Sequence, residues 1–168
     1  MIDRGILSEL DIGPIEYEDY DQALDLLEDL QGHLASLDVM REAYLGYEYR
    51  EVMEGKLNCQ PSLVARLGDE VVAVAVMRVF PETYWAPGFS KHNGPTGEIE
   101  DFVVKADYRS KGIGKSILGH CIQYLTDVGC VRIDIEYLET NNAARNLYTT
   151  SGFKPAIRTS SMMIPENF

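Results

Sequence analysis

The sequence has few of the residues from which disulfide frameworks and metal sites are built. Its three cysteines, Cys59, Cys121 and Cys130, are odd in number and form no CxxC pair, and its three histidines are scattered along the chain. Disulfide scaffolds and zinc sites use paired cysteines or histidines at short spacings. We therefore expect reduced thiols and no bound metal.

Long hydrophobic runs and an excess of basic residues are also missing. No stretch approaches the roughly 20 apolar residues that span a bilayer, and the N-terminus, MIDRGILSEL, lacks a basic segment followed by an apolar run. The net charge of −12 disfavours nucleic acid as a partner, because phosphates require a basic surface. These absences favour a cytoplasmic protein with neither nucleic-acid nor membrane partners.

What is present is the composition of an ordinary globular domain. The chain has 168 residues, of which 45% are hydrophobic and 25% charged, so we expect a single domain spanning 1–168. Charge is unevenly distributed. Residues 1–60 carry 15 acidic and four basic side chains, whereas 61–168 carry 12 and 11. The acidic first part is either a solvated face or a wall that attracts cations.

The hydrophobic pattern predicts an α/β domain. Apolar residues at helical spacing predict helices over 20–30 and 39–53, the second stopped by Gly55. The change to a strand pattern over 61–79 predicts a β-hairpin with its turn at Gly68-Asp69. A long loop rich in proline, glycine and aromatic residues is predicted over 81–97. The pattern further along the chain predicts a strand at 98–104, a helix at 113–128, a strand at 131–138, a helix at 141–151 and a strand at 160–164. The strand–helix–strand unit should be a right-handed crossover between parallel strands.

A glycine-rich loop, RSKGIGK at 109–115, stands between a predicted strand and a predicted helix. Unpaired N–H groups and the positive end of the helix dipole converge at such a helix start. Gly112 and Gly114 would let an anion approach the backbone closely. The spacing is neither the phosphate loop of nucleoside triphosphatases nor the dinucleotide GxGxxG. On spacing alone, phosphate binding and a simple solvated turn remain equal alternatives.

Two segments resemble the GNAT superfamily of N-acetyltransferases. The segment IEDFVVKADYRSKGIGKSIL is similar to the family's first motif, [QR]xxGx[GA] after a strand, through Arg109, Gly112 and Gly114. The segment NNAARNLYTTSGF at 141–153 resembles the next motif. Together the motifs cover about 97–155, and the first is most similar to polyamine (spermidine/spermine) acetyltransferases. The resemblance implies a GNAT fold, with a mixed sheet of about six to seven strands, about four flanking helices, and strands that splay apart at an acetyl-CoA cleft.

The resemblance also implies how acetyl-CoA would be held as co-substrate, with no metal. Pyrophosphate would bind the loop, pantetheine would pair with the strand at 102–104, and the Phe102 N–H would polarise the thioester carbonyl. Asn141 matches a position that contacts the cofactor arm. The implied cofactor-binding residues are Phe102, Val103, Val104, Arg109, Ser110, Lys111, Gly112, Ile113, Gly114, Lys115, Asn141, Ala144 and Tyr148.

Catalytic roles remain divided among several residues. Tyr148 matches the tyrosine that protonates the leaving thiolate; without the motif it would be an ordinary half-buried aromatic. Glu98 matches the base of histone-type members, whereas Glu100 and Asp101 match an acidic pair that binds cationic substrate in polyamine acetyltransferases. A water-mediated base is a further alternative. Regular strand alternation would put Glu98 and Glu100 on one face and Asp101 on the other.

The acceptor is expected to be a small cationic amine, such as a polyamine, a diamine or an aminoglycoside, because the acidic first part would line its cleft. Trp85, in the long loop, would help to select its shape. Peptide N-termini or lysines as acceptors, longer acyl chains, and a non-catalytic acetyl-CoA-binding module remain alternatives. A homodimer is common in the family, with the strand at 160–164 as the edge for pairing.

Overall fold

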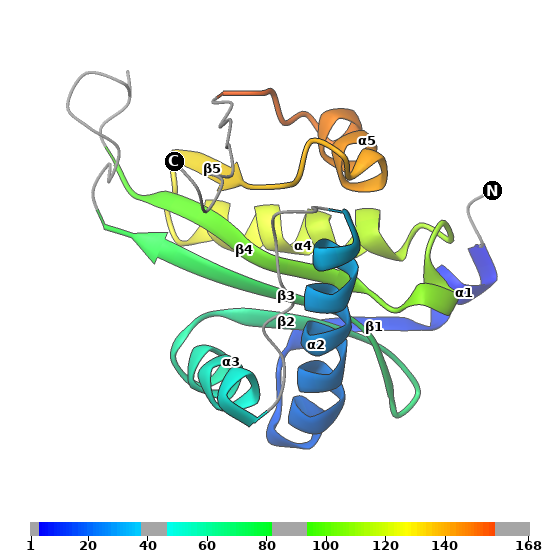
Figure 1. The fold of residues 1–168 in the computed structure, drawn as a ribbon. Helices are drawn as coiled ribbons and strands as arrows, with labels where there is room; N and C mark the ends of the chain where they lie inside the picture. Colours follow the sequence, from blue (N-terminus) through cyan, green and yellow to red (C-terminus); the bar gives the residue numbers. More distant parts are fainter. Residues whose placement is uncertain (1–3, 38–46, 82–93, 157–168) are drawn as a thin grey trace, which may run out of the picture.

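A computed structural model describes residues 4–37, 47–81 and 94–156, which form one mixed sheet with helices on both faces (Figure 1). The strands are β1 (Leu10–Pro14), β2 (Ser62–Leu67), β3 (Glu70–Phe80), β4 (Thr96–Val104) and β5 (Arg132–Ile135), in that spatial order. Successive pairs from β1 to β4 are antiparallel, and β4 and β5 are parallel. The α/β class, the hairpin and the parallel strand–helix–strand unit are confirmed. The described residues contribute five strands, fewer than the six to seven expected.

Two layers of helices enclose the sheet. The helices are α1 (Arg4–Glu9), α2 (Tyr20–Leu37), α3 (Tyr47–Cys59), α4 (Ile113–Asp127) and α5 (Asn142–Thr150). Figure 1 shows α2 and α3 on one side of the sheet and α4 on the other. Each side has its own buried cluster, because sheet residues alternate between the two faces. The strand at 98–104, which carries several of the predicted site residues, therefore lies in a sheet that is covered on both sides.

Helix α4 packs closely on the sheet because its apolar residues recur every three or four positions. Ile113, Ile117, Leu118, Cys121 and Leu125 are all fully buried. On the sheet side, a Cβ built on Gly97 would lie 2.8 Å from Leu125 Cδ2. Such a distance is too short for a side chain, so glycine at this position allows β4 and α4 to approach each other.

The N-terminal third differs most from the sequence-based expectation. The sequence predicted neither α1 nor β1, whose five residues include a glycine and a proline and carry a weak strand signal. The expected stop at Gly55 is wrong: α3 continues through it to Cys59, and α2 extends to Leu37. Glycine in an exposed helix position costs only about 1 kcal/mol relative to alanine, which the packing of Met53 and Leu57 offsets.

Two expectations fall outside the described residues: the loop residue Trp85 and the strand at 160–164. In the part of the chain that the structure does describe, no helix is long and apolar enough to cross a membrane. Within the same ranges, no group of histidine, cysteine or carboxylate side chains has the arrangement of a metal site.

Candidate active site

Strand β4 loses its partner on one side halfway along its length. The parallel pairing with β5 runs only from Thr96↔Arg132 to Ile99↔Ile135, although β4 continues to Val104. The Lys105 N–H donates to the Val72 carbonyl on β3 at 2.9 Å. Since backbone groups alternate in direction along a strand, those of Phe102 and Val104 face away from β3, toward the open side. The result is a short sheet edge that can accept an extended partner.

The glycine-rich loop closes one end of this edge. Ser110 and Gly112 both have positive φ, 62° and 99°, and Gly112 is the N-cap of α4. A Cβ on Gly114 would lie 3.4 Å from Leu147 Cδ2 and 3.5 Å from Val104 Cγ2. Small residues thus bring the loop, the end of β4 and α5 together. The first N–H groups of α4 have no partner within the helix and point out of its N-terminus, as an anion site requires.

Two of the four basic side chains in and around this loop are used for internal contacts. Lys105 pairs with Glu70 at 2.6 Å, and the same carboxylate accepts a hydrogen bond from the Tyr108 hydroxyl at 2.7 Å. Arg109 donates from Nε to the Val104 carbonyl at 2.9 Å, which ties the loop to the strand end. By contrast, the Lys111 ammonium stands over the Tyr108 ring, 5.2 Å from its centre, and Lys115 is exposed. These last two lysines are the cations available near the start of α4.

A β-bulge changes which side chains share a face of β4. The pairing with β3 shifts between Val76↔Asp101 and Met77↔Ile99, leaving Glu100 as an extra residue. The expectation that Asp101 would face away from Glu100 is therefore wrong. Both carboxylates reach Lys56 of α3, at 2.9 Å from Asp101 and 3.3 Å from Glu100. Regular alternation failed as a guide because the bulge inserts one residue into the two-residue period.

Glu100 and Asp101 are ion-paired, whereas Glu98 is not. Arg78 Nη2 lies 2.7 Å from Glu100 Oε1, and Lys56 bridges Glu100 and Asp101. Among the described residues, no cation lies within ion-pair distance of Glu98. Burial, and then the nearby carboxylates of Glu100 and Glu136, raise the pKa of Glu98 above its ordinary value of 4.5. A carboxyl with a raised pKa and no paired cation has the properties of a general base.

Tyr148 lies on the opposite side of β4, in the cluster beneath α4. Its ring packs edge-on against Phe102, with centroids 6.1 Å apart, and also against Tyr137 and Phe153. The residue is 5% exposed, and none of the described residues hydrogen-bonds its hydroxyl. Burial, with a smaller effect of Cys121, raises the pKa of the phenol well above 10. Tyr148 therefore holds its proton throughout the physiological range.

Asn141 and Ala144 form the N-terminal cap of α5. The Asn141 side-chain oxygen accepts the Ala144 N–H at 3.1 Å. This cap is enough to explain an asparagine at position 141, even if Asn141 binds no ligand. The side-chain NH₂ group of Asn141 remains available as a donor. Ile113 is buried, so only its backbone groups are candidates for contact with a cofactor. The side chain of Val103 is buried as well, and its backbone groups face β3, where Val103 pairs with Val74, so the structure offers no free group of Val103 to a cofactor.

Sequence reasoning missed Lys56 and Arg78, the two cations that neutralise Glu100 and Asp101. Arg78 carried a signal, because it is a charged residue that follows the apolar run of residues 71–77 in the second hairpin arm. It lies opposite Glu98 in the register. Lys56 gave none, since its contact with Asp101 joins residues 45 positions apart.

Comparison with known proteins identifies the family. The model of the acetyltransferase (GNAT) family matches residues 22–153. A thialysine N-epsilon-acetyltransferase of Sus scrofa is 34% identical over 64 residues, an alignment that spans 38% of this chain and 38% of that protein.

Solved structures agree with this fold. A GCN5-related N-acetyltransferase from Ralstonia eutropha has a TM-score of 0.72 at 18% identity, covering 92% of this chain and 98% of that one. An aminoglycoside N-acetyltransferase in complex with CoA has a TM-score of 0.64 at 15% identity, covering 93% of this chain and 95% of the other. The family match, which includes β4, the glycine-rich loop and α5, covers most of the sequence. The chain therefore belongs to the GNAT family of acetyltransferases.

Proposed function

We propose that this protein transfers an acetyl group from acetyl-CoA to the primary amine of a small cationic molecule. The observation that carries the proposal is the open edge of β4, which has the glycine-rich start of α4 at one end. The unpaired Glu98 and the buried Tyr148 lie on its two faces. An edge that accepts an extended chain, next to a site for phosphate, suits the pantetheine and pyrophosphate of CoA.

The residues of the loop fit such a co-substrate. The positive φ of Gly112 turns the backbone into the helix start, and Gly114 leaves no Cβ between the loop and the strand end. Lys111 and Lys115 supply positive charge in a protein whose net charge is −12. In this proposal the backbone N–H groups from Lys111 to Lys115 receive the pyrophosphate.

Each chemical step has a candidate residue. The acceptor amine is protonated near neutral pH, and Glu98, directly or through water, removes its proton before attack. The attack places negative charge on the thioester oxygen, where the Phe102 N–H would stabilise it. The carbon–sulfur bond then breaks, and Tyr148 donates its proton to the departing thiolate. A phenol kept neutral by burial is suited to that donation.

The cationic acceptor is supported by the charge around Glu98. Burial, Glu100 and Glu136 raise its pKa more than Arg78 lowers it, and Glu136 forms no ion pair with any of the described residues, so the surroundings favour a positive ligand. Two of the similar proteins named above are, by name, acetyltransferases of thialysine and of an aminoglycoside, which both carry amines. Peptide and protein amines, and binding without catalysis, are the outcomes that an acceptor screen would separate from this proposal.

The first test is calorimetric titration of the protein with acetyl-CoA and with CoA. We expect micromolar binding, which Gly112→Asp abolishes because it adds a negative charge and a side chain at φ 99°. Gly119→Asp is the matched control, since it makes the same change on the exposed side of α4 with nothing within 4 Å. Lys111→Glu provides a second variant if Gly112→Asp does not fold.

A thiol-release assay with spermidine, diamines, monoamines, aminoglycosides and peptides then tests the reaction. Acetylation of small amines supports the proposal. Reaction with peptides alone would contradict the assigned acceptor class, and tight acetyl-CoA binding without any transfer would indicate a binding module.

A further inference from the structure

An ammonium group of the protein itself already occupies the acidic pair on β4. Lys56 Nζ lies 2.9 Å from Asp101 Oδ2 and 3.3 Å from Glu100 Oε2. The side chains of Glu100 and Asp101 are only 13% and 11% exposed, so the ion pairs are partly shielded from solvent. Burial opposes the charge on Lys56, but Asp101 and Glu100 outweigh it and raise the pKa of the lysine. The position between the two carboxylates therefore holds a permanent cation.

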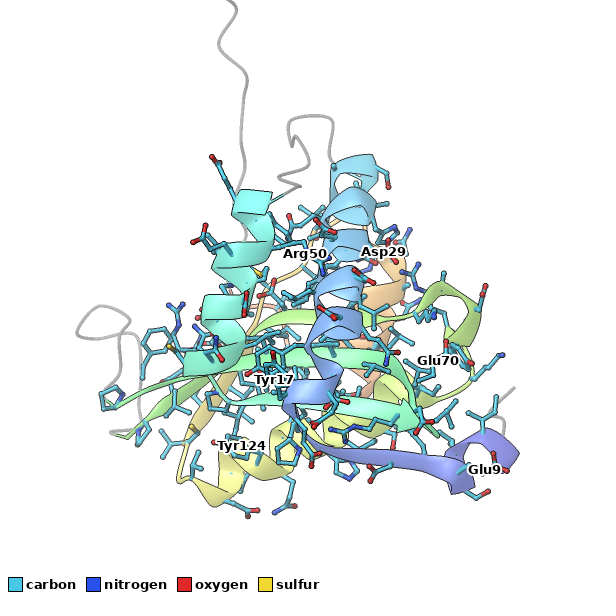
Figure 2. All side chains as sticks on the ribbon, turned by 90° about the horizontal axis from the view of Figure 1, so that it is seen from below. Glu9, Tyr17, Asp29, Arg50, Glu70 and Tyr124 are labelled. Atoms are coloured by element: carbon cyan, nitrogen blue, oxygen red, sulfur yellow. The ribbon has the colours of Figure 1, made fainter. Side chains whose placement is uncertain are left out.

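Lys56 is held in this place by the packing of α3. Met53 and Leu57, on the same helix, are buried against the sheet with 6% and 3% exposure. One turn and a half earlier, Arg50 pairs with Asp25 at 2.7 Å and with Glu28 at 3.1 Å on α2. Figure 2 shows Arg50 between the two neighbouring helices. Because α3 is anchored both to the sheet and to α2, Lys56 is not a freely moving surface lysine.

Among the described residues, the ion pairs around β4 neutralise Glu100 and Asp101 but do not include Glu98. Arg78 pairs with the second oxygen of Glu100 at 2.7 Å, so two cations face the two carboxylates of Glu100 and Asp101. The Gln60 amide, oriented to satisfy both of its ends, adds a hydrogen bond to Glu100 at 3.2 Å and accepts one from Arg78. A cationic ligand gains no net attraction from this neutral cluster. Glu98, two residues from Glu100 on the same face, forms no ion pair with any of the described residues and is only partly compensated by Arg78.

We infer that Lys56 determines acceptor specificity by filling the place where the second ammonium of a polycationic acceptor would bind. This inference rests on the proposed function. An acceptor with a single charged amine needs only the vicinity of Glu98. A diamine or polyamine must also displace Lys56, exchanging one primary ammonium for another of the same kind with no gain. The protein therefore discriminates against polyamines, although it carries the acidic pair that would suit them.

The test compares the binding of spermidine with the binding of a monoamine, butylamine, by calorimetry at low ionic strength. In Lys56→Met the side chain keeps its length and loses its charge. We expect spermidine to bind this variant about tenfold more tightly than wild type, the effect of roughly one charge-assisted hydrogen bond. Butylamine affinity should stay the same. Arg50→Met is the matched control, since it removes one positive charge from the same helix without touching β4, and it should leave both affinities unchanged.

Removal of Lys56 leaves Asp101 without its cation, so stability must be followed as well. We expect spermidine to raise the melting temperature of Lys56→Met more than that of wild type, because a ligand stabilises the folded state according to its affinity. If Lys56→Met does not fold, Lys56→Gln takes its place in both measurements.

The two possible failures are distinguishable. Equal or weaker spermidine binding in a folded Lys56 variant overturns the inference, whatever the enzyme does. Absence of acetyl transfer to every amine, alongside tighter spermidine binding in the variant, would contradict the proposed function and leave Lys56 as the group that excludes a second ammonium. Equal gains in affinity for spermidine and for butylamine would also overturn the inference about Lys56. Lys56 would then repel every cation equally instead of excluding a second ammonium.

Discussion

Glu98 on β4 lies directly opposite Asp134 on β5, in the third of the four pairs that join these parallel strands. Asp134 is held by Arg132, which donates to both of its oxygens at 2.8 and 2.9 Å. Its charge is thereby largely compensated. Glu136 is exposed, and none of the described residues forms an ion pair with it. Of the two carboxylates on the β5 side, Glu136 therefore has the larger effect on Glu98.

The first prediction concerns the pH dependence that Glu98 would give as the proposed base. Because burial, Glu100 and Glu136 raise the pKa of Glu98, the acid limb of kcat/KM should lie above pH 4.5. Activity should rise as pH increases through the raised pKa, since the base must be ionised. Glu136→Gln should move the limb to lower pH. Glu98→Gln should reduce kcat/KM by about 10²-fold or more. An unchanged profile in Glu98→Gln would assign the limb to another group.

The second prediction is that Glu98→Gln is more stable than wild type at neutral pH. A carboxyl whose pKa is higher in the folded protein than in the unfolded chain ionises less readily when folded. Its ionisation therefore lowers the free energy of unfolding as pH rises. Glu98→Gln removes that effect. Thermal melts at pH 4 and pH 8 would show a gain that grows with pH. A loss of stability at pH 8 would mean that Glu98 has a favourable partner instead.

A third prediction separates the chemistry of Tyr148 from its packing. Tyr148→Phe keeps the ring contacts with Phe102 and Phe153 and removes the hydroxyl, which none of the described residues hydrogen-bonds. Stability should change by less than about 1 kcal/mol, whereas kcat should fall about 10²-fold. Tyr137→Phe, which deletes the hydroxyl of a ring 5.6 Å away, is the matched control and should keep its activity. Equal activity of both variants would remove Tyr148 from the proton transfer.

The parts of the fold that the sequence predicted are those with a strong local signal. The periodicity of α4 and the Gly68-Asp69 turn between β2 and β3 each depend on residues close together in the chain. The same holds for the glycine-rich loop, whose positive φ at Gly112 depends on the residue type itself. β1 lacked such a signal, since a five-residue edge strand with glycine and proline has almost no pattern.

The sequence proposed residues for the candidate site but gave no information on their electrostatics. Glu98, Glu100 and Asp101 were singled out, yet the bulge at Glu100 altered their faces, and no local pattern predicts a bulge. The pairing of Asp101 with Lys56 depends on how α3 packs on the sheet, which is a tertiary contact. Ion pairs between distant segments follow from the fold and cannot be derived from residue spacing.

A fourth prediction concerns the ion pair that fixes the start of α2. Arg66 on β2 donates from Nε to Asp19 Oδ1 at 2.9 Å, and Asp19 also accepts the Glu16 N–H at 2.7 Å. The hydrogen bond from Arg66 lowers the pKa of Asp19 below 3.8. Its stabilisation is therefore complete above that pH and is lost as pH falls through the lowered pKa. Asp19→Asn should cost roughly 1–3 kcal/mol at pH 7.

The control for Asp19 is Asp11, whose exposed carboxylate lies 3.4 Å from the same arginine. Asp11→Asn should cost less than about 0.5 kcal/mol, as exposed ion pairs do. Urea denaturation at pH 7 and pH 3 would compare the two. Similar losses for both variants would mean that burial of Asp19 adds nothing to the pair.

The last prediction concerns the contact between β4 and α4 that sets how closely the two elements approach. A Cβ at Gly97 would lie 2.8 Å from Leu125 Cδ2 and 2.9 Å from Cδ1, and Leu125 is fully buried, so it has little room to move. Gly97→Ala should therefore destabilise by about 1–3 kcal/mol, as overpacked cores do. Gly119→Ala on the exposed side of α4, with nothing within 4 Å, should stabilise by about 0.5–1 kcal/mol. Leu125→Ala should cost about 2–5 kcal/mol alone, and less in the Gly97→Ala background, because the added methyl group then fills part of the cavity. Additive losses in the double variant, measured by chemical denaturation, would show that the two residues do not compete for the same space.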